Sequence, residues 1–258
     1  MKVVAIVSAK GGVGKTTVAA NLATALSREM TAPVLAVDMD PQNALGLHLG
    51  MSPQELRGLS RAVLARQPLS SACLPCTPTL FLLPYGALDE PDRMALELAM
   101  DAQADWLQAH LRTLELPDEA VVVLDTPPGP SAYLRQALRA ADVVVVVALA
   151  DAASYATLPL MERLVQTYYR PRGELSEALY VLNQVNSGKA LSKDIAEVMR
   201  SNLAYRLIGT IHEDEAVCEA LAYDTNTLDY APYSQAAVDF IDCAQQLKAV
   251  LQRIPGTP

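Results

Sequence analysis

The sequence predicts an α/β protein with a mostly parallel sheet that is flanked by helices on both faces, and three observations support this fold class. Short apolar runs of strand length alternate with longer segments of helical period. The chain has 258 residues, 51% of them hydrophobic, which is enough for a large core. A glycine-rich turn joins the first expected strand to the first expected helix. We therefore expect a single domain over residues 1–258.

The expected elements follow one another in alternation along the chain. Runs rich in valine, leucine and isoleucine predict strands at residues 2–8, 33–38, 80–84, 120–125, 143–150, 178–185 and 205–211. Helical spacing of apolar residues predicts helices at residues 15–29, 92–115, 131–140, 153–169, 189–201 and 233–253. The least regular stretch, residues 51–79, holds several prolines, and we interpret it as a surface excursion rather than a domain boundary.

Charge and hydropathy limit the partners that the protein can have. The formal net charge of −9 opposes non-specific attraction to DNA or to anionic lipid, because both are polyanions. The longest apolar run, residues 143–150, is too short to cross a bilayer, and the sequence opens on an expected strand rather than on a signal peptide. We therefore expect a cytoplasmic protein with no direct membrane insertion.

Cysteine and histidine usage gives no sign of a metal centre. Cys73 and Cys76 form the only close pair, and neither a second pair nor a histidine stands at the spacing that a zinc site needs. We expect all four cysteines to be reduced thiols, and we assign no catalytic role to the three histidines.

The strongest motif is the stretch SAKGGVGKTT, residues 8–17, between an expected strand and an expected helix. Glycines let backbone N–H groups wrap an anion closely, and the helix N-terminus adds partial positive charge. In this context Lys15 is expected to reach the β and γ phosphates of a nucleotide, Thr16 to bind Mg²⁺ and Thr17 to lie near the α phosphate. Gly11, Gly12, Val13 and Gly14 are the other residues of the loop that we expect to bind the nucleotide. A plain glycine turn is the alternative interpretation.

The loop departs from the general phosphate-loop pattern, since Ala9 replaces the usual first glycine and Lys10 follows it. In this respect it resembles the deviant Walker A loop of the ParA/MinD/Soj family of ATPases. The resemblance implies an ATP-bound sandwich homodimer in which Lys10 reaches the nucleotide of the other subunit. A cation from a partner would neutralise charge that develops between the β and γ phosphates. A solvated lysine at a loop tip is the alternative.

Two acidic segments strengthen the resemblance. VDMDPQNA, residues 37–44, resembles the family's switch I, which implies that Asp40 orients the attacking water and that Asp38 supports the metal shell. VVVLDTPPG, residues 121–129, resembles the Walker B and switch II segment, which implies that Asp125 acts on Mg²⁺ through water. Lys10, Lys15 and Asp40 are the expected catalytic residues. An aspartate at a strand end such as Asp125 can equally be a helix cap.

The nucleotide is expected to be ATP rather than GTP. By resemblance Asn183, in the run LNQVN, is the family's adenine-contacting asparagine, and no Asn-Lys-x-Asp motif for guanine stands there. Residues 211–224 occupy the place where relatives close over the base, so Glu213 and Asp214 are candidates to line the adenine pocket. Acidic residues also open helices for dipole reasons alone.

The family divides by what the ATP-bound dimer holds, and the sequence favours a protein partner over DNA or membrane. Six basic residues could form a patch on adjacent helices, although a mixed-charge face is the favoured interpretation: Arg163, Arg170, Arg172, Lys189, Lys193 and Arg200. The last helix carries only Lys248 and Arg253 as cations, so we expect it to pack on the core. Its apolar positions at helical spacing are Val238, Ile241, Leu247, Val250 and Leu251.

Residues 214–240, 83–93 and 40–50 resemble the BcsQ branch of the family, which is encoded with bacterial cellulose synthases. This resemblance alone implies a slow, partner-regulated ATPase that regulates or localises the cellulose synthesis and secretion machinery through partner proteins. It also implies recruitment to the inner membrane or a cell pole through those partners. The alternative is a ParA-type chromosome or plasmid partitioning ATPase that binds non-specific DNA. A nucleotide-stabilised dimer without turnover also stays open.

Overall fold

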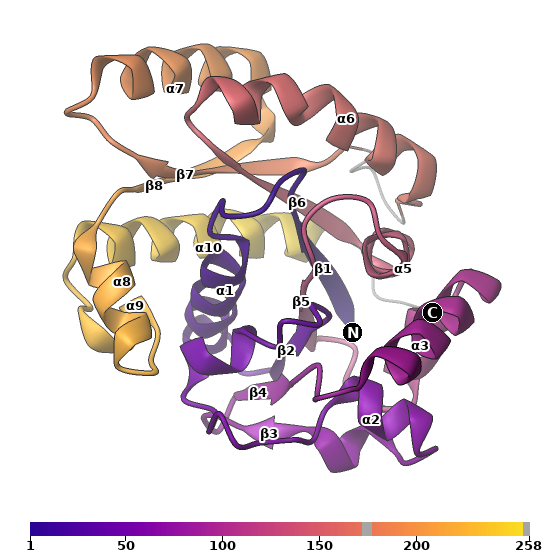
Figure 1. Cartoon of the computed structure of the whole chain (residues 1–258). Coiled ribbons are helices and arrows are strands. Elements are labelled where there is room, and N and C mark those ends of the chain that lie inside the picture. Colours follow the sequence, from indigo (N-terminus) through magenta and orange to yellow (C-terminus); the bar gives the residue numbers. More distant parts are fainter. Residues whose placement is uncertain (172–176, 255–258) are drawn as a thin grey trace.

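A computed structural model describes residues 1–171 and 177–254 of the chain. In this part of the chain eight strands form one sheet in the order β3-β4-β2-β5-β1-β6-β7-β8, and all neighbours are parallel except β3 and β4 (Figure 1). The strands are β1 (Lys2–Val7), β2 (Val34–Asp38), β3 (Leu74–Pro75), β4 (Leu80–Leu83), β5 (Val121–Asp125), β6 (Val143–Leu149), β7 (Leu179–Val185) and β8 (Leu207–His212). The mostly parallel α/β fold predicted from the sequence is confirmed.

Helices cover both faces of this sheet. Their bounds are α1 (Lys15–Glu29), α2 (Leu59–Leu64), α3 (Glu90–Ala102), α4 (Trp106–Arg112), α5 (Ala132–Ala140), α6 (Ala152–Tyr168), α7 (Ala190–Leu203), α8 (Glu215–Ala222), α9 (Thr227–Tyr230) and α10 (Gln235–Arg253). Three short 3₁₀ turns complete the described part of the chain: η1 (Leu45–Leu49), η2 (Leu69–Ala72) and η3 (Ala204–Arg206).

Two cores lie on opposite faces of the sheet, because successive side chains of a strand point to opposite sides. Val4 and Ile6 of β1 join a core with α1 and α10, whereas Val3 and Val7 join a second core with α2 to α7. Both sets of side chains are buried, which explains why the central strands are continuous apolar runs rather than alternating ones. Figure 1 shows α6 and α7 over β6, β7 and β8, with α10 on the other side of these strands.

The strand order reverses at β1, which lies between β5 and β6. The chain adds β2 and β4 on one side of β1 and adds β6, β7 and β8 on the other. In open parallel sheets a crevice forms at the carboxyl ends of the strands where the order reverses. The glycine-rich loop after β1 and the acidic ends of β2 and β5 meet at this edge, because Asp38 pairs in register with Asp125.

All seven strands predicted from the sequence are present, but the helix expected over residues 92–115 is two helices. The side chain of Gln136 on α5 is buried, and its Nε2 donates to the carbonyls of Met100 and Gln103 at 2.6 and 2.7 Å. Its Oε1 accepts from the backbone N–H of Leu107 at 3.1 Å. Gln136 therefore satisfies the backbone groups that the break between α3 and α4 leaves without helical partners.

The interpretation of residues 51–79 as a surface excursion is wrong for much of this segment. Leu59 and Ala62 of α2, together with Leu69 and Ala72 of η2, are buried in the core that faces α3 and α5. Strand β3 then pairs antiparallel with β4 and becomes an edge of the sheet. The prolines interrupt regular structure here without preventing the apolar residues between them from packing.

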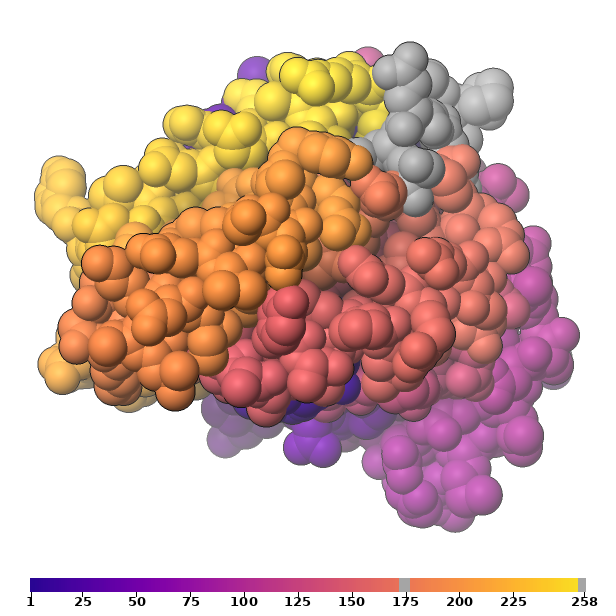
Figure 2. All heavy atoms as spheres, turned by 90° about the horizontal axis from the view of Figure 1, so that it is seen from above, coloured from indigo at the N-terminus to yellow at the C-terminus, as the bar shows by residue number. Residues whose placement is uncertain are grey.

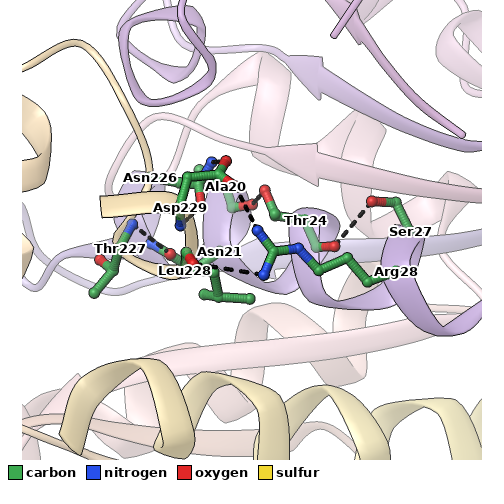
Figure 3. Close-up of polar contacts among 9 residues, drawn as sticks. All are labelled: Ala20, Asn21, Thr24, Ser27, Arg28, Asn226, Thr227, Leu228 and Asp229. Atoms are coloured by element: carbon green, nitrogen blue, oxygen red, sulfur yellow. Dashed lines mark hydrogen bonds and ion pairs between the residues drawn. The ribbon is translucent and has the colours of Figure 1, made fainter. Parts of the chain in front are cut away.

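Helices α8 and α9 were not among the expected elements, and α9 ties the chain after β8 to the outer side of α1 (Figure 3). Asn21 Oδ1 accepts from the backbone N–H of Thr227 at 3.0 Å. Arg28 donates to the carbonyl of Leu228 at 3.5 Å and forms an ion pair with Asp229 at 2.5 Å. The segment that follows the last strand is thus fixed to the helix that follows the glycine-rich loop.

The last helix packs on the core, as expected from the sequence. Phe240, Cys243 and Leu247 of α10 are buried against α1 and β8. Gly209 of β8 lets this helix approach, because a Cβ there would lie 1.9 Å from the sulfur of Cys243. Val238, expected on the apolar face, is instead 43% exposed. No helix in the described part of the chain is long and apolar enough to cross a membrane.

Candidate functional site

The loop between β1 and α1 has a backbone that requires glycine. Gly12 and Gly14 have φ angles of 75° and 78°, in the left-handed region that side chains disfavour. Gly14 also lacks room for a side chain, because a Cβ there would lie 2.3 Å from Nδ2 of Asn183. No side chain of residues 1–171 or 177–254 caps the N-terminus of helix α1 by a hydrogen bond. Its first N–H groups therefore point out of the helix end without a capping side chain, which suits an anion.

Lys15 opens α1 and forms a buried ion pair with Asp125 at the end of β5. The distance between Lys15 Nζ and Asp125 Oδ1 is 2.8 Å, and the two side chains are 6% and 1% exposed. Burial raises the pKa of Asp125, while the Lys15 ammonium and the Thr16 hydroxyl oppose this rise. The second oxygen, Oδ2, is buried and accepts no hydrogen bond from a described residue. Asp125 thus keeps an acceptor for a ligand of the site.

Asp38 lies beside Asp125 on the neighbouring strand β2 and is completely buried. Burial and then the charge of Asp125 raise the pKa of Asp38 well above its ordinary value. The two oxygens of Asp38 accept from the backbone N–H groups of Asp40 and Leu45 at 2.8 and 2.9 Å. These bonds place Asp40, which is 9% exposed, directly beyond the end of β2.

These residues fit a hard divalent cation. Two neighbouring buried carboxylates repel one another, and a cation would relieve that repulsion. The buried Oδ2 of Asp125 offers an oxygen of the type that Mg²⁺ prefers. The hydroxyl of Thr16 comes from the first turn of α1, next to Lys15. The structure therefore brings Thr16, Asp38 and Asp125 to one edge of the sheet, and their role in holding the metal stays a prediction.

Lys10, at the entry to the loop, is held by a residue that sequence reasoning missed. Its Nζ lies 3.0 Å from Asp151 Oδ2, and the two side chains are 29% and 43% exposed. Asp151 also caps α6, because its Oδ1 accepts from the backbone N–H of Ser154 at 2.6 Å. Partial burial by itself raises the pKa of Asp151. The hydrogen bonds from Ser154 and Lys10 outweigh burial, so the pKa of this carboxyl is lowered. The position of Asp151 just before an expected helix could have indicated its role as a helix cap, but nothing in the local sequence indicated its ion pair with Lys10.

Asn183 lies within β7, two residues before the strand ends at Val185, and contacts the glycine-rich loop. Its Nδ2 donates to the carbonyl of Val13 at 2.8 Å, so the side chain supports the loop from below. Asp214 caps α8 and its Oδ2 accepts from the backbone N–H of Ala236 at 3.1 Å. Glu213 accepts from Asn186 at 2.6 Å. The adenine contacts expected of these three residues stay predictions.

The segment after β5 crosses the base of the glycine-rich loop. Thr126 Oγ1 donates to the carbonyl of Ile6 at 2.9 Å, and the backbone N–H of Gly129 donates to the carbonyl of Ser8 at 3.1 Å. The predicted switch II segment is therefore attached to strand β1 through Ile6 and to the first residue of the glycine-rich loop through Ser8. Thr126 was not among the expected site residues, because nothing in its local sequence indicates a contact 120 residues away.

Helices α6 and α7 lie side by side on one face of the molecule (Figure 2). The basic residues expected there alternate with acidic ones, and Lys189 pairs with Glu213 at 3.4 Å. Arg172 lies outside the described residues. Other basic residues of these two helices and their flanks are Arg163, Arg170, Lys193 and Arg200, and acidic ones include Asp151, Glu162, Asp194 and Glu197. The described part of this face carries mixed charge, as the sequence analysis favoured.

The fold and this loop define a class of protein: the phosphate-loop proteins of the ParA and MinD type. The septum site-determining protein MinD of Pyrococcus horikoshii, solved with Mg-ADP, shares the fold with a TM-score of 0.75, 24% identity and 97% coverage of each chain. The chromosome-partitioning ATPase Soj of Thermus thermophilus is 29% identical over 256 residues, which cover 96% of each chain.

Within this class, residues 1–247 match the family model described as cellulose biosynthesis protein BcsQ, so the chain belongs to the BcsQ family. The curated BcsQ of Salmonella typhimurium is 26% identical over 245 residues, which cover 95% of this chain and 93% of that protein. The BcsQ branch inferred from the sequence is thus confirmed at the level of the family. Identity to the Soj partitioning protein is of similar size, so family membership and biological role are separate questions.

Proposed function

We propose that this protein is an ATP-dependent dimerising switch, which hydrolyses ATP to ADP and phosphate and thereby regulates or localises the bacterial cellulose synthesis machinery through partner proteins. The observation that carries the proposal is the buried Lys15–Asp125 pair beside a glycine loop whose backbone requires glycine. Such a buried charge pair is costly to desolvate, so it marks a functional site more than a stabilising one.

The loop residues bind the triphosphate in this account. Backbone N–H groups of Gly11, Gly12, Val13 and Gly14 and the uncapped end of α1 surround the phosphates. Lys15 reaches the β and γ phosphates, and Thr17 lies near the α phosphate. Mg²⁺ neutralises phosphate charge when bound, and Thr16, Asp38 and Asp125 are the residues that would hold it. MinD of P. horikoshii, which shares the fold, was solved with Mg-ADP.

Hydrolysis needs a positioned water molecule and charge neutralisation more than a strong base. Asp40 lies beyond the end of β2 with a small exposed fraction, where its carboxylate can orient water for in-line attack on the γ phosphate. Lys15 offsets the developing charge within its own subunit. Lys10 offsets it across the dimer, after exchanging its exposed partner Asp151 for the phosphates of the second subunit.

The α6–α7 face supports a protein partner rather than DNA. Exposed apolar side chains suit a contact with a protein better than one with a polyanion. Four large side chains on this face are substantially exposed: Tyr155 (41%), Leu160 (37%), Leu191 (70%) and Val198 (50%). The mixed charge of the same face and the net charge of −9 both weaken DNA binding. Family membership supports the cellulose machinery as the source of the partner, with recruitment to the inner membrane or a cell pole through it.

A DNA-partitioning ATPase is the second candidate, and the 29% identity to Soj favours it. The two candidates differ in what the ATP-bound dimer holds. A gel shift of duplex DNA by the ATP-bound protein, lost as salt rises from about 50 to 200 mM, would replace our proposal with the partitioning role. Absence of a shift at both salt concentrations supports a protein partner.

Phosphate release by the wild-type protein and an Asp40→Ala variant tests the enzyme reaction. We expect slow release by the wild type and a loss of at least about 100-fold in the variant, because positioning groups typically contribute that much. The variant should retain ATP and accumulate as a dimer. Normal release by the variant would remove Asp40 from the mechanism. ATP binding by the wild type without any release would instead indicate a nucleotide-stabilised dimer without turnover.

A further inference from the structure

The turn that carries Asp40 ends at a residue with an unusual backbone. Asn43 has a φ angle of 52°, in the left-handed region that asparagine tolerates better than most side chains. Its backbone N–H donates to the carbonyl of Asp40 at 2.8 Å, and Asp40 Oδ1 accepts from the N–H of Gln42 at 3.0 Å. The position of Asp40 therefore depends on where Asn43 is held.

The side chain of Asn43 attaches this turn to a different part of the chain. Its Oδ1 accepts from the backbone N–H of Tyr85 at 2.9 Å and from that of Gly86 at 3.3 Å. Both partners are donors, so the amide oxygen rather than the nitrogen must face them. One side-chain oxygen thus joins the loop after β2 to the loop after the neighbouring strand β4.

The Tyr85 segment is itself fixed from several directions. The side chain of Tyr85 is 1% exposed, and its hydroxyl lies 2.8 Å from that of Tyr133 on α5. Ser60 of α2 donates from its hydroxyl to the carbonyl of Tyr85 at 2.6 Å. Gly58 packs on Gly86 so closely that a Cβ on Gly58 would lie 2.3 Å from the Gly86 nitrogen. The Tyr85–Gly86 backbone, to which the Asn43 side chain bonds, is therefore held in a fixed position.

We propose that Asn43 is a positioning residue for ATP hydrolysis, which holds the Asp40 turn against the Tyr85–Gly86 backbone; this rests on the proposed function. A small displacement of a positioning group can cost about 100-fold in rate. Nucleotide affinity depends mainly on α1 and its preceding loop, which the Asn43 side chain does not bond. Loss of the tether should therefore lower kcat and leave the KM for ATP nearly unchanged.

Glycine separates the two properties of Asn43, because it adopts the left-handed backbone without strain but lacks the acceptor. We expect Asn43→Gly to lower kcat at least about 10-fold, with a KM for ATP within about twofold of wild type. Asn43→Asp keeps an oxygen for both N–H donors and should return kcat to within about threefold of wild type. Equal kcat for Asn43→Gly and wild type, or no recovery in Asn43→Asp, overturns the proposal.

A matched control comes from Glu115, an exposed residue before β5 with a φ angle of 49°. Glu115→Gly makes the same backbone change at the opposite end of the sheet, so its kcat should equal that of wild type. A comparable fall in Glu115→Gly would mean that glycine at a left-handed position lowers activity generally, which overturns the specific role of Asn43.

Hydrogen exchange at the Tyr85 and Gly86 amides gives a readout that does not depend on turnover. Exchange should be faster in Asn43→Gly than in wild type and close to wild type in Asn43→Asp. Unchanged exchange in the glycine variant overturns the tether. A wild-type protein that binds ATP without releasing phosphate overturns the proposed hydrolysis together with this role, whereas wild-type turnover that Asn43→Gly preserves overturns only the role of Asn43.

Discussion

The two lysines of the glycine-rich loop lie in opposite environments, although only four residues separate them. Lys15 is 6% exposed and pairs with an aspartate that is 1% exposed, within the core of the site. Lys10 is 29% exposed and pairs with an aspartate that is 43% exposed, at the surface. The N–O distances of the two pairs are 2.8 and 3.0 Å, so burial rather than geometry distinguishes them.

This difference supports the proposed roles of Lys15 as a fixed cation and of Lys10 as an exchangeable one. Breaking a buried ion pair leaves an uncompensated charge in a medium of low dielectric, which costs several kcal/mol. An exposed pair contributes about 0–1 kcal/mol, so a competing anion can replace its acidic member. Lys15 is therefore suited to a fixed position beside the phosphates, and Lys10 to a transfer between partners.

The largest effect on stability is expected from Lys15→Ala. The variant leaves Asp125 buried without its counter-charge, so the free energy of unfolding should fall by about 3–5 kcal/mol. Affinity for a fluorescent ATP analogue should fall at least about 100-fold as the phosphate contact is lost. Urea denaturation and equilibrium titration measure the two effects.

The second substitution Asp125→Asn, added to Lys15→Ala, serves as a control. It removes the unpaired charge, so it should recover part of the lost stability without restoring nucleotide binding. A Lys15→Ala variant as stable as wild type would show that the buried Lys15–Asp125 pair contributes no more to stability than the exposed Lys10–Asp151 pair.

Gly14→Ala should have the next largest effect. A left-handed backbone costs a non-glycine residue about 1–3 kcal/mol, and the new Cβ would meet Asn183 at 2.3 Å. Gly12→Ala is the matched variant, because Gly12 has a similar φ of 75° but no atom of the described residues within 4 Å of a Cβ at that position. Thermal or urea denaturation should show Gly14→Ala to be the less stable. Equal losses of stability in the two variants would show that the close contact with Asn183 adds nothing to the cost of a side chain at position 14.

His48 shows the effect of burial on the pKa of a group, because burial is the dominant cause of its pKa shift. Burial lowers its pKa from 6.5 to about 4, so the folded protein favours the neutral imidazole. Its contribution to stability is present above pH 6.5 and is lost as the pH falls toward 4, by up to about 3 kcal/mol. The difference in free energy of unfolding between wild type and His48→Gln should change in that window. Parallel pH profiles of the two proteins would contradict the assignment.

The smallest effect on stability is expected from Lys10→Ala, at or below about 1 kcal/mol, because its ion pair is exposed. ATP affinity should stay within about threefold of wild type, while turnover should be lost with the trans cation. Asp151→Asn is the control, since asparagine preserves the cap of α6 and releases Lys10. It should dimerise at least as well as wild type; weaker dimerisation would mean that the Lys10–Asp151 pair assists rather than competes.

Local patterns were sufficient to predict the sheet and the loop. The central strands are buried on both faces, so they appear as apolar runs such as residues 143–149, which are easily found. The order of strand, glycine turn and helix places Lys15 and Thr16 without any tertiary information. The acidic ends of β2 and β5 were singled out by another route, the resemblance of residues 37–44 and 121–129 to the switch I and Walker B segments of the family.

Long-range side-chain contacts were not predictable. Lys10 and Asp151 are 141 residues apart, and Gln136 shapes the break between α3 and α4 from another helix. Asn43 reaches a loop 42 residues further along the chain, and no periodicity records that contact. Such contacts depend on how elements pack rather than on propensity, so they become visible only in the folded structure.

We propose that Lys10 acts across an ATP-bound dimer. Light-scattering mass of the wild type and Lys10→Ala, each with ADP and with ATP·Mg²⁺, tests it most directly. We predict twice the 27.7 kDa monomer mass for the wild type with ATP·Mg²⁺ and the monomer mass in the other three samples. A Lys10→Ala variant that dimerises with ATP as well as the wild type, or a wild type that stays monomeric, would contradict the account.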